Sequence, residues 1–297
     1  MKVSIIIPNY NGRELLEKNL GSVIDAFKNK NNKICEVIIV DNGSKDSSIE
    51  YINSNFKPYV KLIKHTKNRG FSTAVNTGAR ASKGEILCLL NNDVIPEVNF
   101  LEKALDLFED KDVFSVSLHE KGRGPSGALF NNGIIDLSHS KPEAKNPVLS
   151  FYTSGAAGLF RKSIWKELSG LDDRLLSPFY WEDIDICYRA SKRGYLNIWC
   201  PYGKVIHNHE STSSKLPKKY VARIKERNQL LMLWKNIQSK SFLQKHFNEL
   251  LKRLYSHPGY LLVVFMALMR ITTVFKLRNK EIKESVVSDE AVFQRYS

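Results

Sequence analysis

The first 95 residues alternate short apolar runs with longer segments whose apolar residues recur every three or four positions. The apolar runs are residues 3–7, 34–40, 60–63 and 86–90. Runs of this length without a polar interruption are typical of strands buried on both faces of a sheet. The segments between them have the spacing of amphipathic helices, as at Leu16, Leu20, Val23, Ile24 and Phe27. The pattern predicts β-α-β-α-β-α-β, an open parallel sheet with helices on both faces.

Polar and glycine-rich sequence follows each of these predicted strands. The four loops are residues 8–12, 41–44, 67–71 and 91–93. Because ligands bind outside the carboxyl ends of parallel strands, we expect the four loops to share one site. The first strand is not followed by G-x-G-x-x-G, and G-x-x-x-x-G-K-[ST] does not occur. The loops therefore favour neither a dinucleotide fold nor a P-loop.

The second half of the chain mixes shorter elements. Its pattern predicts helices over 100–108, 163–170 and 182–194 and strands over 195–200 and 205–207. Residues 154–158 are small and flexible, which suits close approach of a ligand. Two further loops, 121–127 and 138–148, have no readable pattern, and we expect substrate specificity to lie in them.

The four cysteines favour a reducing compartment. Each lies far from the others and next to apolar residues, and no C-x-x-C spacing occurs; they are Cys35, Cys88, Cys187 and Cys200. We expect buried, reduced thiols, neither zinc ligands nor disulfides. The first residues lead directly into a strand pattern that Pro8 interrupts, so no signal peptide is expected. These features predict a cytoplasmic protein.

Basic charge is concentrated in the last third of the chain. Residues 1–214 hold 28 Lys and Arg against 25 Asp and Glu, whereas residues 215–297 hold 17 against 6. Such asymmetry indicates an anionic partner, either a membrane or a nucleic acid. No nucleic-acid recognition motif accompanies the charge, so nucleic acid is not expected.

An apolar run at 261–269 lies within this basic region. Nine residues are too few to cross a bilayer, which takes about 20, and Arg270 ends the run. We therefore predict a basic amphipathic helical tail over 236–297 that lies on the inner face of the plasma membrane. A packed helical appendage and a homodimer interface are the alternatives.

Several motifs occur in an order that resembles a known family. They are Ile6-Ile7-Pro8-Asn9-Tyr10-Asn11, Val40-Asp41-Asn42-Gly43-Ser44, Asn68-Arg69-Gly70-Phe71 with Asn76, Leu90-Asn91-Asn92-Asp93, Gly155-Ala156-Ala157-Gly158, Trp181-Glu182-Asp183 and His207. The chain resembles the family 2 glycosyltransferases, and among them the bacterial rhamnosyltransferase-like enzymes of surface polysaccharide synthesis. The resemblance implies a GT-A (Rossmann-like) α/β fold over residues 1–235, a mostly parallel sheet flanked by helices.

The resemblance also implies a nucleotide-sugar donor and residues that bind it. Asp41 would contact the base or ribose, although a turn-forming role is the alternative. Arg69 would face phosphate near a helix N-terminus, unless it is simply exposed to solvent. The full predicted donor set is Pro8, Asn9, Tyr10, Asp41, Asn68, Arg69, Asn76, Asn91 and Asn92.

Asp183 is the predicted catalytic base. Inverting transfer needs one carboxylate to take the proton of the attacking hydroxyl. Glu182 is the rival, and a set of acids that only stabilises a helix N-terminus is the alternative to both. Trp181 would offer a flat apolar face to a sugar ring. The predicted acceptor set is Trp181, Glu182, Gly155 and Ala156.

Asp93 and His207 are the predicted ligands of a divalent cation, Mg²⁺ or Mn²⁺. A hard cation held by carboxylate oxygen would neutralise the charge that develops on a departing nucleoside diphosphate. Asn91 stands where a D-x-D motif would have a second carboxylate, so metal affinity should be modest without the donor. His209 is the alternative histidine.

The resulting hypothesis is inverting, metal-dependent transfer of a sugar from a UDP- or dTDP-sugar, such as dTDP-rhamnose, to a hydroxyl of a saccharide or lipid-linked saccharide. One alternative is a catalytically inactive nucleotide-sugar or polymer-binding module. Another is a sugar nucleotidyltransferase, which would need a Gly-rich loop with Arg and Lys after the first strand. Residues 8–12 do not supply that loop.

Overall fold

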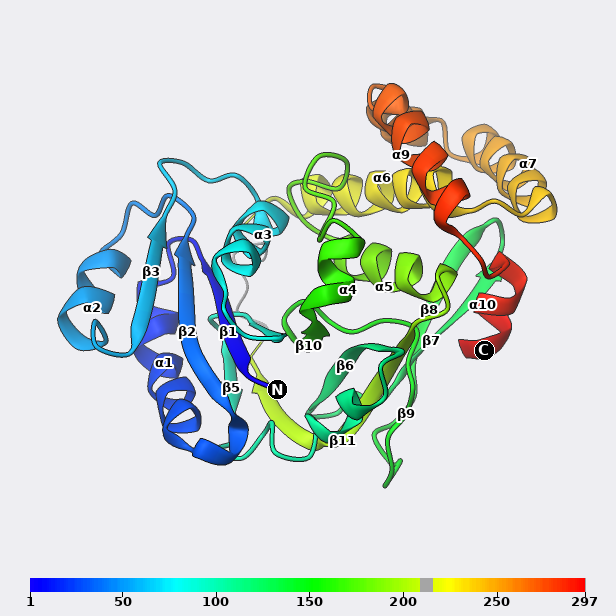
Figure 1. The fold of residues 1–297 in the computed structure, drawn as a ribbon. Helices are drawn as coiled ribbons and strands as arrows, with labels where there is room; N and C mark the ends of the chain where they lie inside the picture. The colour runs from blue at the N-terminus through cyan, green and yellow to red at the C-terminus, as the bar shows by residue number, and fades with distance from the viewer. Residues whose placement is uncertain (209–215, 297) are drawn as a thin grey trace.

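The fold is built on one large mixed sheet. A computed structural model of the chain describes residues 1–208 and 216–296. In this part of the chain nine strands form the sheet, in the order β3-β2-β1-β4-β10-β6-β11-β5 with β9 paired beside β11 (Figure 1). Their bounds are β1 Val3–Asn9, β2 Ile34–Asp41, β3 Val60–Lys64, β4 Ile86–Leu90, β5 Val94–Pro96, β6 Val113–Glu120, β9 Val148–Leu149, β10 Ala157–Arg161 and β11 Leu196–His207.

The first four strands have the predicted parallel topology. β1 pairs in parallel with both β2 and β4, and β2 pairs in parallel with β3. The helices α1 (Arg13–Lys28), α2 (Ser48–Asn55) and α3 (Phe71–Ala81) connect them. This half confirms the predicted α/β class and brings the four polar loops to one edge of the sheet.

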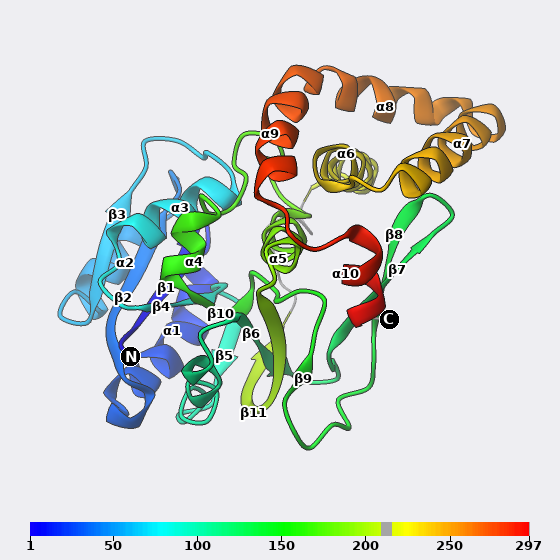
Figure 2. The same cartoon turned by 45° about the vertical axis from the view of Figure 1, so that its right-hand side comes forward.

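Alternation along β1 explains why its sequence is apolar throughout. Ile5 and Ile7 belong to the core that Leu16 and Leu20 of α1 complete. Ile6 points to the opposite core, which holds residues of α3, α4 (Lys162–Glu167) and α5 (Glu182–Lys192). Figure 2 shows helices on both sides of the sheet. Since both faces are covered, no position of the strand favours a polar side chain.

The second half of the sheet contains antiparallel pairs and differs from prediction in detail. β10 lies antiparallel between β4 and β6, and β5 and β9 are both antiparallel to β11. The two strands expected over 195–200 and 205–207 are one strand, β11, whose register shifts between Trp199 and Lys204. The helix expected over 100–108 was wrong, because that segment forms turns before the 3₁₀ helix η2, Asp106–Glu109.

A hairpin occupies part of the two loops that had no readable pattern. β7 (Ser126–Asn131) pairs antiparallel with β8 (Ile134–His139). The three buried cysteines Cys88, Cys187 and Cys200 are free thiols, as predicted. The prediction of a buried thiol is wrong for Cys35, which is free but exposed.

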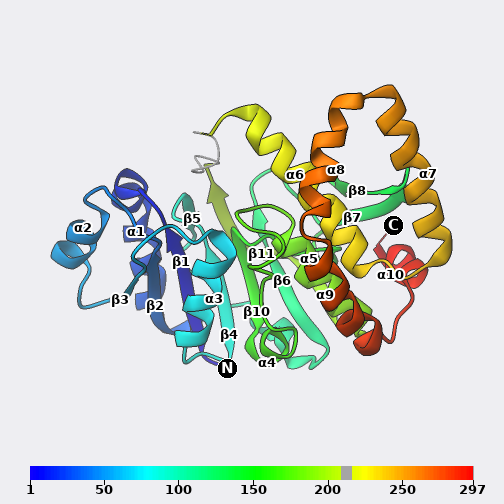
Figure 3. The same cartoon turned by 90° about the horizontal axis from the view of Figure 1, so that it is seen from above.

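The C-terminal helices pack on the body of the protein. They are α6 Lys218–Asn236, α7 Lys240–Ser256, α8 Leu261–Leu268, α9 Ile271–Glu284 and α10 Asp289–Tyr296. α7, α8 and α9 arch over α6 (Figures 2 and 3), and α10 lies against β7 and α5. Trp234 Nε1 donates to His246 Nε2 at 2.9 Å, and the rings of Phe151 and Phe293 stack at 5.8 Å. The predicted tail thus shares a core with α5, α6 and the hairpin.

No single helix in residues 1–208 and 216–296 is long and apolar enough to cross a membrane. Pro258–Leu268 and Ile271–Glu284 meet the length and composition of a span only as a pair, and the pair is bent by 65°.

Candidate active site

Asn9, the last residue of β1, joins the loops that follow β2 and β4. Its Nδ2 donates to Asp41 Oδ1 at 3.1 Å, and its Oδ1 accepts from Asn92 Nδ2 at 2.8 Å. Gly12 permits this arrangement, because a Cβ there would lie 2.2 Å from Asn92 Nδ2. Three of the predicted loops therefore meet around one amide. Two predicted donor residues flank it, Pro8 and Tyr10, and both are half-buried.

Asp41 is buried and supports the turn that follows β2. Besides the bond from Asn9, its Oδ2 accepts from the backbone N–H of Ser44 at 3.0 Å. Asp41 therefore has the turn-forming role that the sequence left open. A carboxylate has about four acceptor positions, so these two bonds leave capacity for a ligand.

Asn42 brings the fourth loop to the others, a role that the sequence did not indicate. Its Nδ2 donates to Asn68 Oδ1 at 3.0 Å, and its Oδ1 accepts from the backbone N–H of Arg69 at 3.1 Å. The side chain of Arg69 is exposed at the start of α3. The exposed cation of Arg69 thus lies beside a helix N-terminus, where the predicted contact with phosphate would be made.

Asn76 was predicted to bind the nucleotide-sugar donor, but the structure gives it a different role. Its Nδ2 donates to Leu171 O at 2.8 Å, and its Oδ1 accepts from Leu171 N at 3.0 Å. The side chain is buried, and both ends of its amide are engaged with the backbone. We therefore correct the predicted donor contact to a structural one, which fixes the chain after α4.

Asp93 and His207 lie next to each other, although 114 positions separate them in the sequence. The antiparallel pairing of β5 with β11 places His207 opposite Val94. His207 Nε2 lies 3.2 Å from Asp93 Oδ1, and its Nδ1 lies 3.5 Å from Glu120 Oε2. Among the described residues, His207 is the one hydrogen-bond donor near the two buried oxygens of Asp93. Glu120, at the end of β6, was not predicted.

The two carboxylates control the charge of His207. Burial on its own would lower the pKa of this imidazole, but Asp93 and Glu120 outweigh it and raise the pKa to about 9. In residues 1–208 and 216–296, no group of three or more His, Cys, Asp or Glu has a spacing suited to a metal ion. The predicted alternative ligand His209 lies outside the described residues. The pair itself fits the type of ligands that a divalent cation takes, since it combines a buried carboxylate with an imidazole.

Asp183, in the first turn of α5, is held by two backbone N–H groups. Its Oδ2 accepts from Gly155 N at 3.1 Å, and its Oδ1 accepts from Ile184 N at 2.9 Å. Burial raises the pKa of Asp183, and these bonds oppose the rise by stabilising the charged form. The side chain is only half-buried, so it remains open on one side.

Glu182 differs from its neighbour in environment. Its side chain is buried, and its Oε2 has no hydrogen-bond partner among the residues that the structure describes. Burial and the adjacent Asp183 carboxylate raise the pKa of Glu182 well above its ordinary value. Glu182 thus favours its protonated form more than an ordinary carboxyl group does. Of the two rival carboxylates, Asp183 is the one that accepts hydrogen bonds from two backbone N–H groups, which stabilise the charged form that a base needs.

Trp181 does not have the role that the sequence predicted. Only 4% of the residue is exposed, and it packs in the core shared with the C-terminal helices. The prediction that Trp181 offers a flat face to a sugar ring is therefore wrong. Tyr180 is 37% exposed, and its ring centroid lies 5.2 Å from that of Phe179. Tyr180 and Trp181 both have positive φ, 70° and 76°, a strained turn just before α5.

Gly155 and Ala156 connect the two parts of the site. The N–H of Gly155 bonds Asp183, and the carbonyl of Ala156 accepts from Asn91 N at 2.8 Å. Asn91 in turn begins the triplet that ends in Asp93. One dipeptide therefore positions the candidate base relative to the candidate metal ligands, although both its residues were predicted as acceptor contacts.

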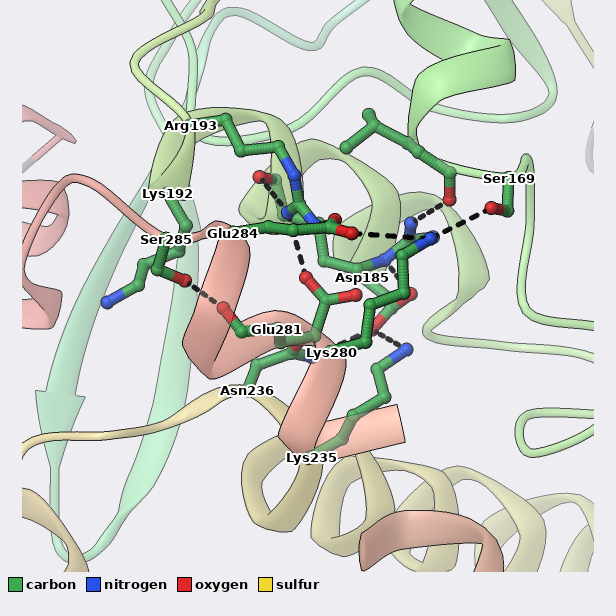
Figure 4. A network of polar contacts seen from close by, with 12 residues as sticks. Ser169, Asp185, Lys192, Arg193, Lys235, Asn236, Lys280, Glu281, Glu284 and Ser285 are labelled. Carbon is green, nitrogen blue, oxygen red and sulfur yellow. Dashed lines mark hydrogen bonds and ion pairs between the residues drawn. The ribbon is translucent and has the colours of Figure 1, made fainter. Parts of the chain in front are cut away.

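Ion pairs with α6 and α9 hold α5 in place (Figure 4). Asp185 lies 2.8 Å from Arg189 Nε and 2.6 Å from Lys235 Nζ on α6. Burial on its own would raise the pKa of Asp185, but Lys235 and Arg189 lower it to about 2. Arg193 reaches Glu281 of α9 at 2.8 Å, which extends the network to the C-terminal helices.

A small, open pocket lies beside Glu120, lined by residues of β6 and β7 and of the segment from Ser150 to Ser154. It includes Glu120, which contacts His207, and Ser154, which precedes Gly155. Most of its lining is polar: Ser117, Glu120, Arg123, Ser126, His139, Ser150, Tyr152 and Ser154. Tyr152 Oη lies 3.1 Å from His139 Nε2. Hydroxyl, carboxylate and guanidinium groups of this kind suit a polyhydroxylated ligand.

Several known proteins have sequences similar to that of this chain. The family model for glycosyl transferase family 2 matches residues 4–168. The O-antigen chain rhamnosyltransferase WbaN of Salmonella anatum is 25% identical over 73% of this chain and 69% of its own length. The O-antigen chain rhamnosyltransferase RfbN of Salmonella typhimurium is 24% identical over 74% of this chain and 70% of its own.

Solved structures of proteins with lower sequence identity to this chain share its fold. GalNAc-T7, solved with UDP, GalNAc and Mn²⁺, superposes with a TM-score of 0.65 at 14% identity, over 88% of this chain and 57% of that one. The mannosyltransferase PcManGT of Pyrobaculum calidifontis, in complex with GDP-Man and Mn²⁺, gives 0.57 at 17% identity, over 95% and 85%. These likenesses confirm the predicted GT-A fold.

Proposed function

Because this chain belongs to glycosyl transferase family 2 and is a glycosyltransferase, we propose that it moves a sugar from a nucleoside-diphosphate donor to a hydroxyl group with inversion at the anomeric carbon. The proposed acceptor is a saccharide or a lipid-linked saccharide of a cell-surface polysaccharide. The names of its O-antigen relatives support this context, and they make dTDP-rhamnose the first donor to test beside UDP-sugars.

The connection from Asp183 through Gly155 and Ala156 to Asn91 carries the proposal. Group transfer needs a base and a leaving-group site held at a fixed separation, because misplacement of either slows the reaction. Here β10 and the two backbone hydrogen bonds fix both. The polar side chains around the small pocket beside Glu120 and Ser154 are assigned to the acceptor.

Donor binding is assigned to the four loops at the strand ends. Asp41 and Asn9 would face the base and ribose, with Pro8 and Tyr10 as the wall beside them. Arg69 and the N-terminus of α3 would face the diphosphate. Asn91 and Asn92 would contact the donor between these groups and Asp93.

Asp93 and His207 would hold a divalent cation, Mg²⁺ or Mn²⁺. Two similar structures that contain Mn²⁺ beside a nucleotide support this assignment. Such a cation neutralises charge on the diphosphate. The raised pKa of His207 means that the imidazole carries a proton at neutral pH when only Asp93 and Glu120 face it. Cation binding would displace that proton.

In the proposed reaction, Asp183 takes the proton from the acceptor hydroxyl. The oxygen forms a bond to the anomeric carbon as the bond between that carbon and the diphosphate oxygen breaks. The nucleoside diphosphate leaves with the electron pair of the broken bond. Because attack occurs opposite the leaving group, the configuration inverts. Glu182, the neighbouring carboxyl group, is assigned a hydrogen bond to the acceptor.

A donor screen tests this function. The chain is incubated with UDP-, GDP- and dTDP-sugars, Mn²⁺ or Mg²⁺ and saccharide acceptors, and both nucleoside diphosphate and product mass are measured. Diphosphate release that depends on acceptor supports the proposal. Donor binding without turnover under every condition would favour the inactive module, and pyrophosphate release from a nucleoside triphosphate would favour a nucleotidyltransferase.

A further inference from the structure

Helix α8 is apolar on both of its faces. Its sequence, Leu261–Leu268, contains no polar residue. Val263, Val264 and Ala267 are buried, and the helix packs against α6. The opposite face is bare: Leu261 is 62% exposed, Phe265 57% and, just beyond the helix, Met269 73%. A helix at the surface of a protein in water normally has a polar outer face, so this outer face needs a partner.

The neighbouring helices enlarge the exposed apolar surface. Leu251 and Tyr255 near the end of α7 are 66% and 92% exposed, and Phe275 of α9 is 58% exposed. We define the outer apolar face as these three residues with Leu261, Leu262, Phe265, Leu268 and Met269. All come from the arch of α7, α8 and α9 (Figures 2 and 3).

The charge around this face has one sign. Residues 250–280 contain six Lys and Arg and no Asp or Glu. Lys252 and Lys276 are exposed beside the apolar residues. An apolar face bordered by cations matches a membrane surface with anionic lipids, where acyl chains accept the apolar groups and headgroups attract the lysines. We propose that the outer apolar face binds the surface of an anionic bilayer.

A second copy of the chain fits this face less well. A symmetric contact would bring together two surfaces with the same net positive charge, because the six Lys and Arg of residues 250–280 outnumber the bordering carboxylate of Glu249, which pairs with Lys252. An anionic lipid surface supplies the opposite charge directly.

The inner contacts of the arch favour a position on the membrane over insertion across it. Arg270, between α8 and α9, donates to the carbonyls of Arg174 and Leu175 at 2.9 and 2.7 Å. Arg278 of α9 donates to the carbonyl of Trp234 at 2.9 Å. Inserting the pair would break these bonds and pull Val263, Val264 and Val274 from the core. The α8–α9 pair is therefore part of the folded body, with one side turned to the bilayer.

Membrane binding goes beyond sugar transfer and does not depend on it. The network of Figure 4 links the arch to α5, so the outer apolar face and the candidate active site belong to one packed unit. A bound bilayer at the inner face of the plasma membrane would thus hold the site close to lipid-linked acceptors.

Vesicle co-sedimentation of the full chain tests the proposal. One set of vesicles is phosphatidylcholine, and the other is phosphatidylcholine and phosphatidylglycerol in equal parts. The wild type should bind the anionic vesicles more strongly, and less as salt is added. The double variant Phe265→Glu with Met269→Glu should bind about tenfold more weakly or worse.

The control introduces the same charge far from the arch. Val98 and Leu149 are 55% and 42% exposed, and Val98→Glu with Leu149→Glu should bind vesicles like the wild type. Far-UV circular dichroism and thermal unfolding confirm that each variant is folded. Wild type that binds neither vesicle, or an α8 variant that binds as well as wild type, would overturn the proposal. So would a solution dimer that the α8 variant dissociates without any vesicle binding.

Discussion

The carboxylate of Asp183 accepts a hydrogen bond from the backbone N–H of Gly155 at 3.1 Å. This contact ties the first turn of α5 to the chain entering β10, and through Ala156 to Asn91. The acidic start of a helix would by itself be explained by the helix dipole. A bond to a strand that also supports the Asp93 loop is a specific arrangement, and it gives Asp183 a fixed place in the site.

Replacing Asp183 by Asn should remove the base and keep the shape. We expect kcat to fall by about 10²- to 10⁴-fold, the usual contribution of general base catalysis. The donor Kd, measured by calorimetry, should stay within about twofold of wild type, because the donor loops are untouched.

Glu182→Gln is the matched control for this variant. Burial and Asp183 raise the pKa of Glu182 well above its ordinary value, so an amide of the same shape should be a mild replacement. Its kcat should remain far closer to wild type than that of Asp183→Asn. Equal damage from the two variants would contradict the assignment of Asp183 as the base.

The rate should also depend on pH through Asp183. Burial raises the pKa of this carboxyl, and only the deprotonated form can accept a proton. The value of kcat/KM should therefore fall as the pH is lowered through a pKa above the usual carboxyl range of about 4. The same acidic limb should persist in Glu182→Gln. A rate independent of pH on the acidic side would count against this interpretation.

Asn91→Asp tests the two-ligand view of the metal site. The added carboxylate would stand two residues before Asp93, as in a D-x-D motif. Titration with Mn²⁺ should show weak binding by wild type alone and tighter binding when nucleoside diphosphate is present. The variant should bind Mn²⁺ more tightly without nucleotide, whereas Asp93→Asn should lose binding. If nucleotide makes no difference to wild type, the donor does not complete the site.

Lys235→Met tests the ion pairs behind α5. Lys235 Nζ lies 2.6 Å from Asp185 and 2.9 Å from Asp172, and it is buried. Its removal leaves buried carboxylates short of a partner, so we expect a loss of about 3 kcal/mol in the free energy of unfolding. Denaturant titration gives this value. Lys252→Met, which breaks an exposed pair with Glu249, should leave stability unchanged.

Local sequence patterns were sufficient for the first half of the fold. β1, β4 and most of β2 are buried, and a polar loop follows each of the four strands, so the parallel order and the shared edge could be predicted. The pairing of Asp93 with His207 was predicted from a family resemblance. Its structural cause, the antiparallel contact of β5 and β11, was not visible in a three-residue strand.

Residues whose roles depend on distant contacts could not be predicted in this way. Glu120 ends a strand like many other carboxylates, and only the fold brings it to His207. Asn76 belongs to a family motif, yet Leu171 occupies its amide. Trp181 stands beside the acidic pair, but a left-handed backbone turns it into a core that the C-terminal helices complete.

The anomeric configuration of the product tests the central claim most directly. Wild-type protein is incubated with a donor that turns over in the screen, Mn²⁺ and acceptor, and the product is examined by NMR. Direct displacement with Asp183 as the base predicts that the new linkage has the configuration opposite to that of the donor. A product that retains the donor's configuration would contradict the account.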